Sequence, residues 1–496
     1  MTTAPDPAPT PAPPAATGDR PGRTAGNVIA VAVSQILGKV LTLAWTAVAA
    51  RELTQAQFGA FNFSLSLALI LNAIAEWGFD PALVRLASRR PADLNRHYTE
   101  AIAGETVVGL LLFGAVLAAT LPSRTGPHVR LATALVFVSV FVDLWSDTAR
   151  SVGAAAQRQG RTSTALVVQR LVTAALVLPL LLLGAGIAGL AAGLLVGSLV
   201  GWVANISALR SFGAKLTWRE LRLPSLIEFS RLSLPIGVSA LMLVLTARLD
   251  TVLIEALKGN RDVAAYAAAY RLFETVLFVT FAVSSATFTL MSAAAEDHDR
   301  VREVVRSGAV ATTVLLLPFA AVCLVDAAPI LRLFYGATYA AQSAGALRWL
   351  AVAPLVYSVA FFGSTALIAV GRNRGLLIAS TVAAVVNLVA NLIVIPTYAG
   401  TGAAAVTTLS YAVEAVVGIV LLRRHIGRVG LVGWASEAVA AAVLAGLFLW
   451  VVPAPMPVEV PLAVALYFLA WGLLARWRQP DQLRVVAGLI PGRRNR

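Results

Sequence analysis

Four basic residues, Lys39, Arg170, Arg248 and Arg271, interrupt long apolar stretches of this sequence. A charge at the centre of a bilayer costs about 2.5 to 3.5 kcal/mol on insertion scales, so such a residue tends to face a cavity or a partner. An ammonium or guanidinium group there can bind an anionic group such as a phosphate, and the fork of an arginine can make two parallel N–H bonds to it. These residues are the first candidates for ligand binding.

Lys39 lies near the middle of the first apolar stretch, too deep to extend easily to either membrane surface. One hypothesis places its ammonium group in a central cavity, where it attracts an anionic ligand. The other pairs it with a buried carboxylate, for which Glu105, Asp143 and Asp147 are the candidates. The sequence leaves both open.

Arg248 and Asp250 form a second charged group with Arg271 and Glu274. Arg271 and Glu274 are three positions apart and share a helix face, which favours an ion pair within one helix and leaves phosphate binding as the alternative. Arg170 lies near the end of its stretch, where it can guide the same ligand or extend to the membrane surface.

Asn387 and Asn391 are four positions apart and point the same way from a predicted helix. Such residues bind a sugar or, more commonly, join neighbouring helices by hydrogen bonds. Glu414 is a candidate for coupling to an ion or for pairing with another helix. The candidates for ion coupling or ion pairing as a group are Asp143, Asp250, Glu274 and Glu414.

The elements that must position these residues are membrane-spanning helices. Of 496 residues, 58% are hydrophobic and 13% are charged, whereas soluble domains have roughly a quarter charged residues. The fold class expected is an all-α integral membrane protein with about 14 transmembrane helices. The expected spans are 27–50, 58–77, 101–121, 131–149, 163–183, 186–207, 234–257, 264–292, 308–325, 346–369, 375–396, 401–421, 432–452 and 458–475.

The basic residues between the spans predict the orientation. With a cytoplasmic N-terminus, most lysines and arginines fall in connections on the cytoplasmic side, as the positive-inside rule requires. Both termini are therefore expected in the cytoplasm. The same distribution accounts for the net charge of +14 without nucleic-acid binding, since no basic stripe with interleaved aromatic residues is present.

Metal and disulfide chemistry are not expected. Cys323 is the single cysteine, and the four histidines fall in predicted loops or helix ends. No metal site and no cofactor are predicted.

Two weak internal repeats indicate two lobes. Phe58–Phe61 resembles Ala264–Tyr266, and Gly186–Ala191 resembles Ala399–Ala404. The offsets predict two six-helix lobes of equal orientation, related by a pseudo-two-fold axis along the membrane normal, as in one class of transporter. The predicted parts are a disordered cytoplasmic tail (1–25), an N-terminal lobe (26–210), an amphipathic cytoplasmic linker (211–232), a C-terminal lobe (233–424), two extra helices (425–476) and a basic cytoplasmic tail (477–496).

A series of short motifs runs along nearly the whole chain. They are Ala50-Arg51-Glu52-Leu53, Phe58-Gly59, Gly78-Phe79, Ala82-Leu83-Val84-Arg85, Leu234-Pro235-Ile236-Gly237, Arg248-Leu249-Asp250, Ala264-Ala265-Tyr266, Tyr270-Arg271, Ile330–Gly336, Asn387–Asn391, Pro396 and Gly400. Each motif is degenerate, but in this order they resemble the Wzx-like polysaccharide transporter (oligosaccharide flippase) family.

This resemblance implies a function. It implies a flippase of the bacterial inner membrane that moves a polyprenyl-diphosphate-linked oligosaccharide from the cytoplasmic to the outer leaflet by alternating access, for cell-surface polysaccharide biosynthesis. The implied partners are that glycan, membrane lipids and the polymerase or glycosyltransferases of the same pathway. The substrate-binding residues would be Lys39, Arg170, Arg248, Arg271, Asn387 and Asn391.

Two other functions are possible from the sequence. A multidrug cation antiporter of the related extrusion family is the closer alternative, but a lysine at position 39 would repel a cationic substrate. A membrane-embedded glycosyltransferase would need a sizeable extracytoplasmic loop, and the predicted outer connections are short. We therefore expect a transporter rather than an enzyme.

Overall fold

The computed structural model describes residues 21–120, 126–294, 296–430, 435–452 and 455–478. Within these ranges the chain is helical and contains no strand, which confirms the predicted all-α membrane fold. The helices are α1 (Pro21–Glu52), α2 (Gln55–Glu76), α3 (Phe79–Arg89), η1 (Pro91–Asp93), α4 (Leu94–Thr120), α5 (Pro127–Ala155), α6 (Gln159–Leu182), α7 (Gly186–Arg210), η2 (Trp218–Glu220), α8 (Leu223–Lys258), α9 (Asn260–Val276), α10 (Phe278–Ala293), α11 (His298–Val325), α12 (Ala327–Tyr335), α13 (Ala337–Ala369), α14 (Asn373–Ile426), α15 (Ser436–Val451) and α16 (Met456–Arg478).

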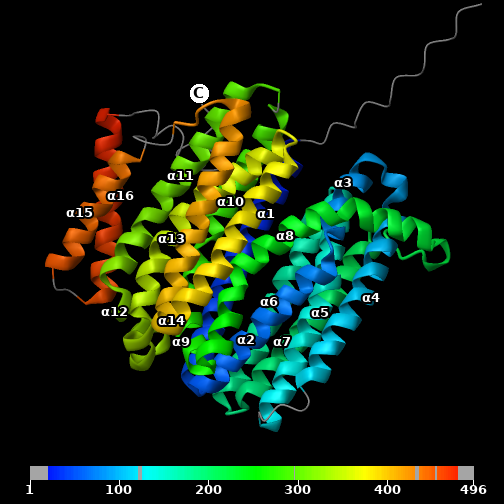
Figure 1. Cartoon of the computed structure of the whole chain (residues 1–496), viewed down its shortest axis with the longest axis horizontal. Helices are drawn as coiled ribbons and strands as arrows, with labels where there is room; N and C mark the ends of the chain where they lie inside the picture. Colours follow the sequence, from blue (N-terminus) through cyan, green and yellow to red (C-terminus); the bar gives the residue numbers. More distant parts are fainter. Residues whose placement is uncertain (1–20, 121–125, 295, 431–434, 453–454, 479–496) are drawn as a thin grey trace, which may run out of the picture.

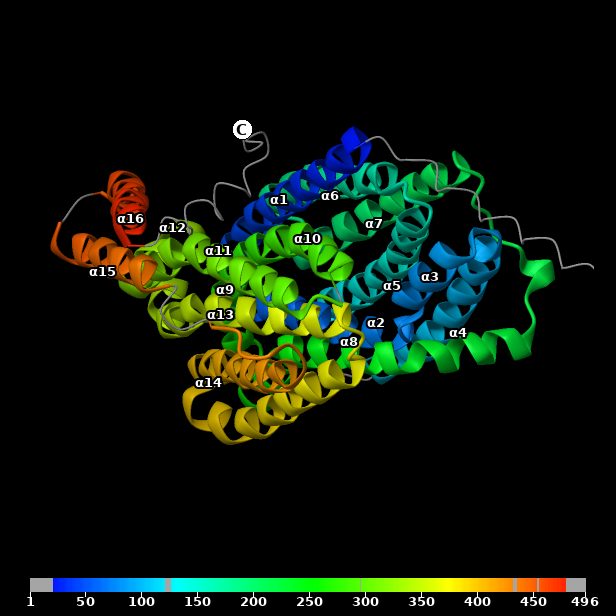
Figure 2. The same cartoon turned by 90° about the horizontal axis from the view of Figure 1, so that it is seen from above.

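The described part of the chain contains 11 helical segments that are long and apolar enough to cross a membrane. α14 counts once among them, although its 54 residues would extend roughly 80 Å as a straight helix, far more than one bilayer thickness. Its backbone leaves helical geometry at Ala399, where φ is 45°, and the two arms lie side by side (Figure 2). Two further helices are not among these 11 segments. They are α15, which is apolar but shorter, and α1, which is 32 residues long.

The helices form two lobes, and α15 and α16 lie at the edge of the second (Figure 1). α2 to α7 gather on one side, and α9 to α14 on the other. α8 extends from one lobe to the other and packs against both α2 and α14. α1 packs on α6 and also touches α9, α10 and α12, so it lies between the lobes.

Three details differ from the predicted spans. Two short helices, α3 and α12, were not predicted, because neither is long enough to appear as a span. The segment predicted as a separate linker is in part the beginning of α8, which continues without a break from Leu223 into the membrane. α1 begins at Pro21, inside the segment predicted as a tail.

α2 and the turn that follows it form part of the contact between the lobes. At Gly59, an added Cβ would collide with the backbone carbonyl of Asn260 at the start of α9. At the other end, an added Cβ on Gly78 would lie 2.5 Å from the backbone nitrogen of Gly237 in α8. Both glycines belong to motifs of the family resemblance, and the structure gives each a physical reason, because only glycine permits so close a backbone approach.

Candidate functional site

A cavity of about 270 Å³ lies between the two lobes and is bordered by side chains from α1, α2, α5, α6, α7, α8 and α9. One part of its wall is apolar and includes Leu65, Leu69 and Leu194. The remainder carries charge. This combination of apolar wall and few polar groups is typical of a ligand site.

All four basic residues identified in the sequence border this cavity. Lys39 comes from α1, Arg170 from α6, Arg248 from α8 and Arg271 from α9. They are separated by up to about half the chain in sequence and converge because α1 and α8 lie between the lobes. The structure therefore brings together the part of the predicted site that was defined by positive charge.

Glu274 connects two of these residues. One of its carboxylate oxygens is 2.5 Å from Nη2 of Arg248, and the other is 2.8 Å from Nη1 of Arg271. The three side chains are only 13 to 17% exposed. The ion pair between Arg271 and Glu274 that their spacing favours is thus present, and the same carboxylate also holds an arginine from the neighbouring helix.

Arg248 has a second contact, because its guanidinium carbon lies 5.4 Å from the centre of the Tyr270 ring. Such a cation–π contact stabilises a partly desolvated arginine. Tyr270 is itself fixed, since its hydroxyl donates to the carbonyl of Ala247 at 2.8 Å. Arg248 is therefore held in one place between a ring and a carboxylate.

Lys39 and Arg170 are less restrained. In the described ranges, no carboxylate comes within 4.0 Å of either cationic group. Asp143 is the remaining carboxylate of the cavity, and it accepts a hydrogen bond of 2.7 Å from Nε2 of Gln169. The cavity thus contains four cationic groups and two carboxylates, which leaves an excess of positive charge.

Two of the three carboxylates predicted as partners of Lys39 have other partners in the structure. Both oxygens of Glu105 accept from the Thr148 hydroxyl, at 2.8 and 2.7 Å, and Asp147 forms an ion pair with Arg150. Neither borders the cavity of Lys39. Asp143 does border it, so of the three candidate partners only this one shares the space.

The other predicted site residues lie elsewhere. Asp250 accepts hydrogen bonds from the hydroxyl groups of Tyr266 and, at 3.0 Å, Thr407. Asn391 donates to Asn387 at 3.0 Å, and Asn387 donates to Ser410 at 3.2 Å. None of the three predicted residues borders the cavity, and the two asparagines join the arms of α14.

Glu414 is also remote from the cavity. It is 3% exposed, and its Oε1 accepts a hydrogen bond of 3.4 Å from the hydroxyl of Ser364. This contact joins α13 to the second arm of α14.

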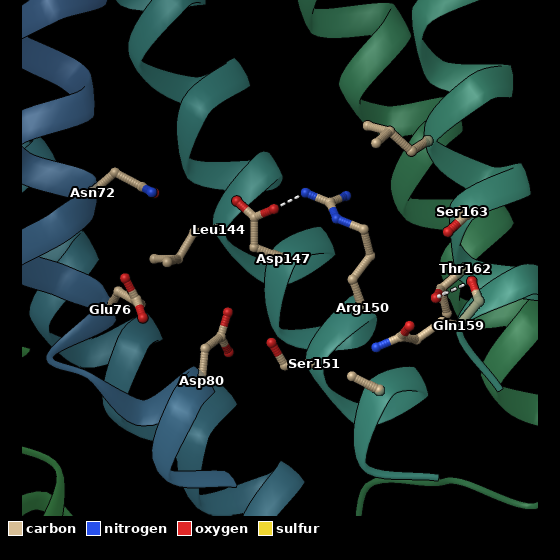
Figure 3. Close-up of a pocket in the computed structure, with 12 residues that line it drawn as sticks. Asn72, Glu76, Asp80, Leu144, Asp147, Arg150, Ser151, Gln159, Thr162 and Ser163 are labelled. Carbon is tan, nitrogen blue, oxygen red and sulfur yellow. Dashed lines mark hydrogen bonds and ion pairs between the residues drawn. The ribbon is translucent and has the colours of Figure 1, made fainter. Parts of the chain in front are cut away.

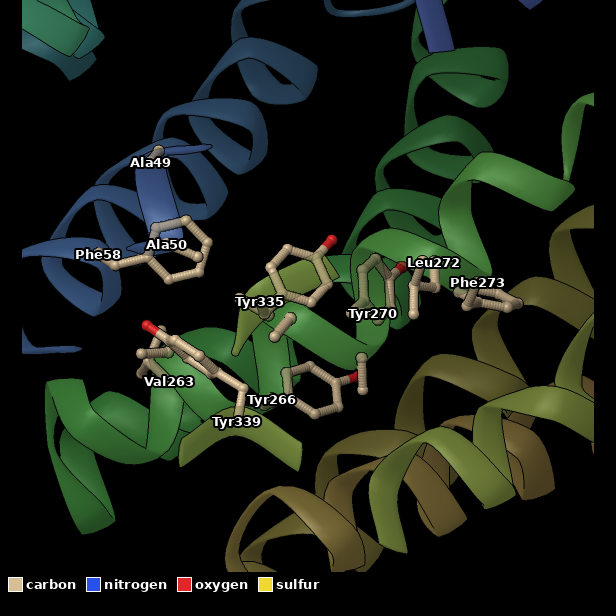
Figure 4. Close-up of a cluster of buried hydrophobic side chains, with 14 of the residues drawn as sticks. Ala49, Ala50, Phe58, Val263, Tyr266, Tyr270, Leu272, Phe273, Tyr335 and Tyr339 are labelled. Carbon is tan, nitrogen blue, oxygen red and sulfur yellow. The ribbon is translucent and has the colours of Figure 1, made fainter. Parts of the chain in front are cut away.

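Aromatic side chains of α2, α12 and α13 pack together in a buried cluster (Figure 4). Phe58 of α2 packs edge-on against Tyr339, with ring centres 6.0 Å apart, and Tyr339 packs against Tyr335. Beside it, Arg51 donates from Nε to the carbonyl of Phe334 at 3.1 Å and from Nη2 to that of Leu333. These carbonyls end α12, where a cation is favoured. Two sequence motifs far apart in the chain thus form one contact between lobes.

Sequence reasoning missed Glu76 and Asp80, which border a second cavity inside the N-terminal lobe (Figure 3). Both stand in an apolar stretch around Trp77 and Gly78. Two carboxylates in such a stretch are visible in the sequence and could have been identified as candidates. In the part of the chain that the structure describes, no three His, Cys, Asp or Glu side chains gather closely enough to form a metal site.

Two family profiles match the sequence, each over more than half of its length. The profile for "Polysaccharide biosynthesis protein" matches residues 24–292, and that for "Lipid II flippase MurJ" matches residues 168–469. Among curated protein sequences there is no significant match.

Solved structures share the fold. The lipid II flippase MurJ in an inward closed conformation has a TM-score of 0.74 at 13% identity, covering 92% of this chain and all of its own. An inward-facing multidrug resistance MATE family transporter has a TM-score of 0.61 at 17% identity, covering 81% of this chain and 96% of its own. A transporter from Pyrococcus furiosus, described as having a binding pocket of reverse polarity, has a TM-score of 0.62 at 14% identity, covering 81% and 95%. At these identities the likeness concerns the fold alone.

Proposed function

We propose that this chain, which belongs to the MOP superfamily of flippases and exporters, moves a polyprenyl-diphosphate-linked oligosaccharide from the cytoplasmic to the outer leaflet of the bacterial inner membrane. The observation that supports this passenger is the excess of positive charge in the cavity between the lobes. A diphosphate is the part of such a lipid that this charge would attract. The name of one matching family, lipid II flippase, favours a lipid-linked passenger as well.

The size of the cavity indicates which part of the passenger it would hold. Its volume, about 270 Å³, is below the usual range of roughly 300 to 1,000 Å³ for drug-sized ligands. It suits a diphosphate with the first sugar rather than a whole lipid. The polyprenyl chain would remain in the bilayer while the charged group crosses between the lobes.

Lys39 and Arg170 are the residues most available to the diphosphate, because no carboxylate compensates them within 4.0 Å among the described residues. Arg248 and Arg271 would contribute through the N–H groups that Glu274 does not use. Alternating access would then expose the same residues to each side in turn. Asp143 and Glu274 set how much positive charge remains when the passenger has left.

A multidrug cation antiporter is the second candidate, favoured by the shared fold of the MATE transporters. The charge of the cavity argues against it, because a cationic drug would be repelled by the excess of positive charge that Lys39, Arg170 and the two other arginines give the cavity. Both termini are proposed to be cytoplasmic, as the basic connections indicate. Polymerase or glycosyltransferase partners of the same pathway are part of this proposal.

Export of the surface glycan in a deletion strain tests the proposal. Lys39→Gln and Arg170→Gln remove one positive charge each without breaking an ion pair closer than 4.0 Å among the described residues, and each is expected to lower export at least tenfold. Lys258→Gln, at the end of α8 and outside the cavity, is the matched control. Membrane insertion is checked by the amount of protein in purified membranes. Export at the wild-type rate by both cavity variants would contradict the assignment.

A further inference from the structure

Four buried polar atoms lie at or beside the contact between the lobes without a hydrogen-bond partner among the described residues. These four orphan atoms are the hydroxyl oxygens of Tyr335, Tyr339 and Ser343 and the side-chain oxygen of Asn260. The tyrosines are 2% and 3% exposed, and the serine is fully buried. Buried polar groups are nearly always hydrogen-bonded in proteins, because an unmade bond costs the full desolvation of the group. Four exceptions in one region therefore need an explanation.

The orphan atoms gather where α2 packs on the second lobe. The ring centres of Tyr335 and Tyr339 are 6.1 Å apart, and Tyr339 packs edge-on against Phe58 of α2. Ser343 follows Tyr339 by four positions and shares its face of α13. Asn260 begins α9, and its backbone carbonyl closely approaches α2.

The tyrosine hydroxyl groups do not satisfy each other. Figure 4 shows those of Tyr335 and Tyr339 directed apart. Thr46 of α1 lies close to the Tyr335 hydroxyl but forms no hydrogen bond with it, and donates instead to the carbonyl of Thr42 at 2.7 Å. The rings are thus well packed in this conformation while their hydroxyl groups lack partners. We expect this where a surface also serves in a second conformation, in which other groups reach the hydroxyls.

Tyr335 connects this region to the cavity between the lobes. Its hydroxyl group lies near enough to Arg271 and Glu274 to interact with their charges, and both of these residues border the cavity. In the orientation proposed above, the turn between α1 and α2 and the helix α12 lie on the outer side of the membrane. A diphosphate in the cavity would then have Tyr335 and Tyr339 on the side by which its sugars leave.

We propose that Tyr335 and Tyr339, together with the ring of Phe58, form an exit subsite for the sugars of the lipid-linked glycan beyond the first one. This inference rests on the proposed function, since it needs a passenger with several sugars. When the lobes separate on the outer side, the contact of α2 with α13 opens and frees the rings and hydroxyl groups. A sugar has an apolar face of C–H groups and a rim of hydroxyl groups, so aromatic faces and phenolic hydroxyls bind both parts. The orphan oxygens gain there the partners that they lack here.

Removal of single hydroxyl groups tests this exit subsite. Tyr335→Phe and Tyr339→Phe keep the rings and delete the orphan oxygens. Because these oxygens have no partner in this conformation, the unfolding midpoint of the purified full chain in detergent is expected to stay unchanged or to rise. Export of the surface glycan is expected to slow roughly threefold to tenfold in each variant, which is the effect of one hydrogen bond.

Tyr467→Phe is the matched control. The Tyr467 hydroxyl is also buried, but it donates to the carbonyl of Val314 at 2.8 Å, where α16 packs on α11. This variant is expected to lower the unfolding midpoint and to leave the export rate per molecule unchanged. An equal fall in midpoint for Tyr335→Phe and Tyr339→Phe would show that their hydroxyl groups already have partners, which would overturn the inference.

A lipid that carries one sugar separates sugar binding from the opening and closing of the contact. A strain without the transferase for the second sugar makes this lipid, and periodate added to spheroplasts oxidises the sugar only after it has crossed the membrane. Both tyrosine variants are expected to transfer the one-sugar lipid at the wild-type rate. Slower transfer of the full glycan alone supports the exit subsite, whereas equal slowing of both lipids, or of neither, overturns it.

Failure of the proposed function gives a different result, because Lys39→Gln and Arg170→Gln would then export at the wild-type rate. Loss of export in those two variants together with wild-type export in both tyrosine variants would overturn the exit subsite and leave the proposed function in place.

Discussion

The cavity between the lobes and the pocket inside the N-terminal lobe differ in the sign of their charge and in how that charge is compensated. Between the lobes, Glu274 holds two arginines from two helices, and the excess is positive. Inside the lobe, Glu76 and Asp80 border one pocket and have no cationic group within 4.0 Å among the described residues, and the excess is negative. The same mutation, a carboxylate changed to an amide, should therefore have opposite consequences in the two places.

The largest expected effect is that of Glu274→Gln. Removing one partner of a buried ion pair costs about 3 to 5 kcal/mol, because the other charge stays buried without compensation. Here two arginines, Arg248 and Arg271, lose their carboxylate together. Glu76→Gln removes a charge that has no ion-pair partner and is expected to leave stability unchanged or higher. Thermal unfolding of both variants in detergent measures the difference.

A triple variant tests whether the unpaired arginines cause the loss of stability. Replacing Glu274 together with both arginines by neutral residues should recover much of the lost stability, because no unpaired charge then remains. The structure indicates that buried charge is compensated by ion pairs in one region and not in the other. Equal destabilisation by Glu274→Gln and Glu76→Gln would contradict this difference.

Gly78→Ala, with an intermediate effect, tests how the pocket is joined to α8. A left-handed residue with a side chain costs roughly 1 to 2 kcal/mol, and here the added methyl group also meets the backbone of Gly237 and Ser233. Gly213→Ala carries the same strain, since its φ is 83°, but has open space around it. We expect a larger loss of stability at position 78 than at position 213, measured by thermal unfolding. Equal losses would mean that the contact with α8 adds nothing.

The sequence predicted the fold well because the signal for a membrane helix is local. A run of about 20 apolar residues is sufficient evidence for a span, so the main elements were found. The short helices α3 and α12 lack that length and were missed. The continuity of α8 was missed as well. Its composition changes from amphipathic to apolar, which indicated two elements, whereas the backbone remains helical from Leu223 to Lys258.

The candidate site was predictable only in part. Each basic residue of the cavity stands out as a charge in an apolar stretch, which is visible in sequence. Asp250 is two positions from Arg248, so the two side chains leave opposite sides of a helix. Asp250 was therefore not to be expected in the cavity that Arg248 borders. Asn387 and Asn391 do share a face, but which neighbour that face meets depends on the rotation of α14, which no local pattern specifies.

Trp77→Phe has the smallest expected effect. The ring would be kept, whereas the hydrogen bond from the indole nitrogen to the carbonyl of Ser230, 3.3 Å long, would be lost. A single bond of this kind contributes about 1 kcal/mol, so the unfolding midpoint should fall only slightly. Because this bond joins the break between α2 and α3 to α8, export should slow although the unfolding midpoint changes little. Export at the wild-type rate would show that this hydrogen bond does not support the contact between the lobes.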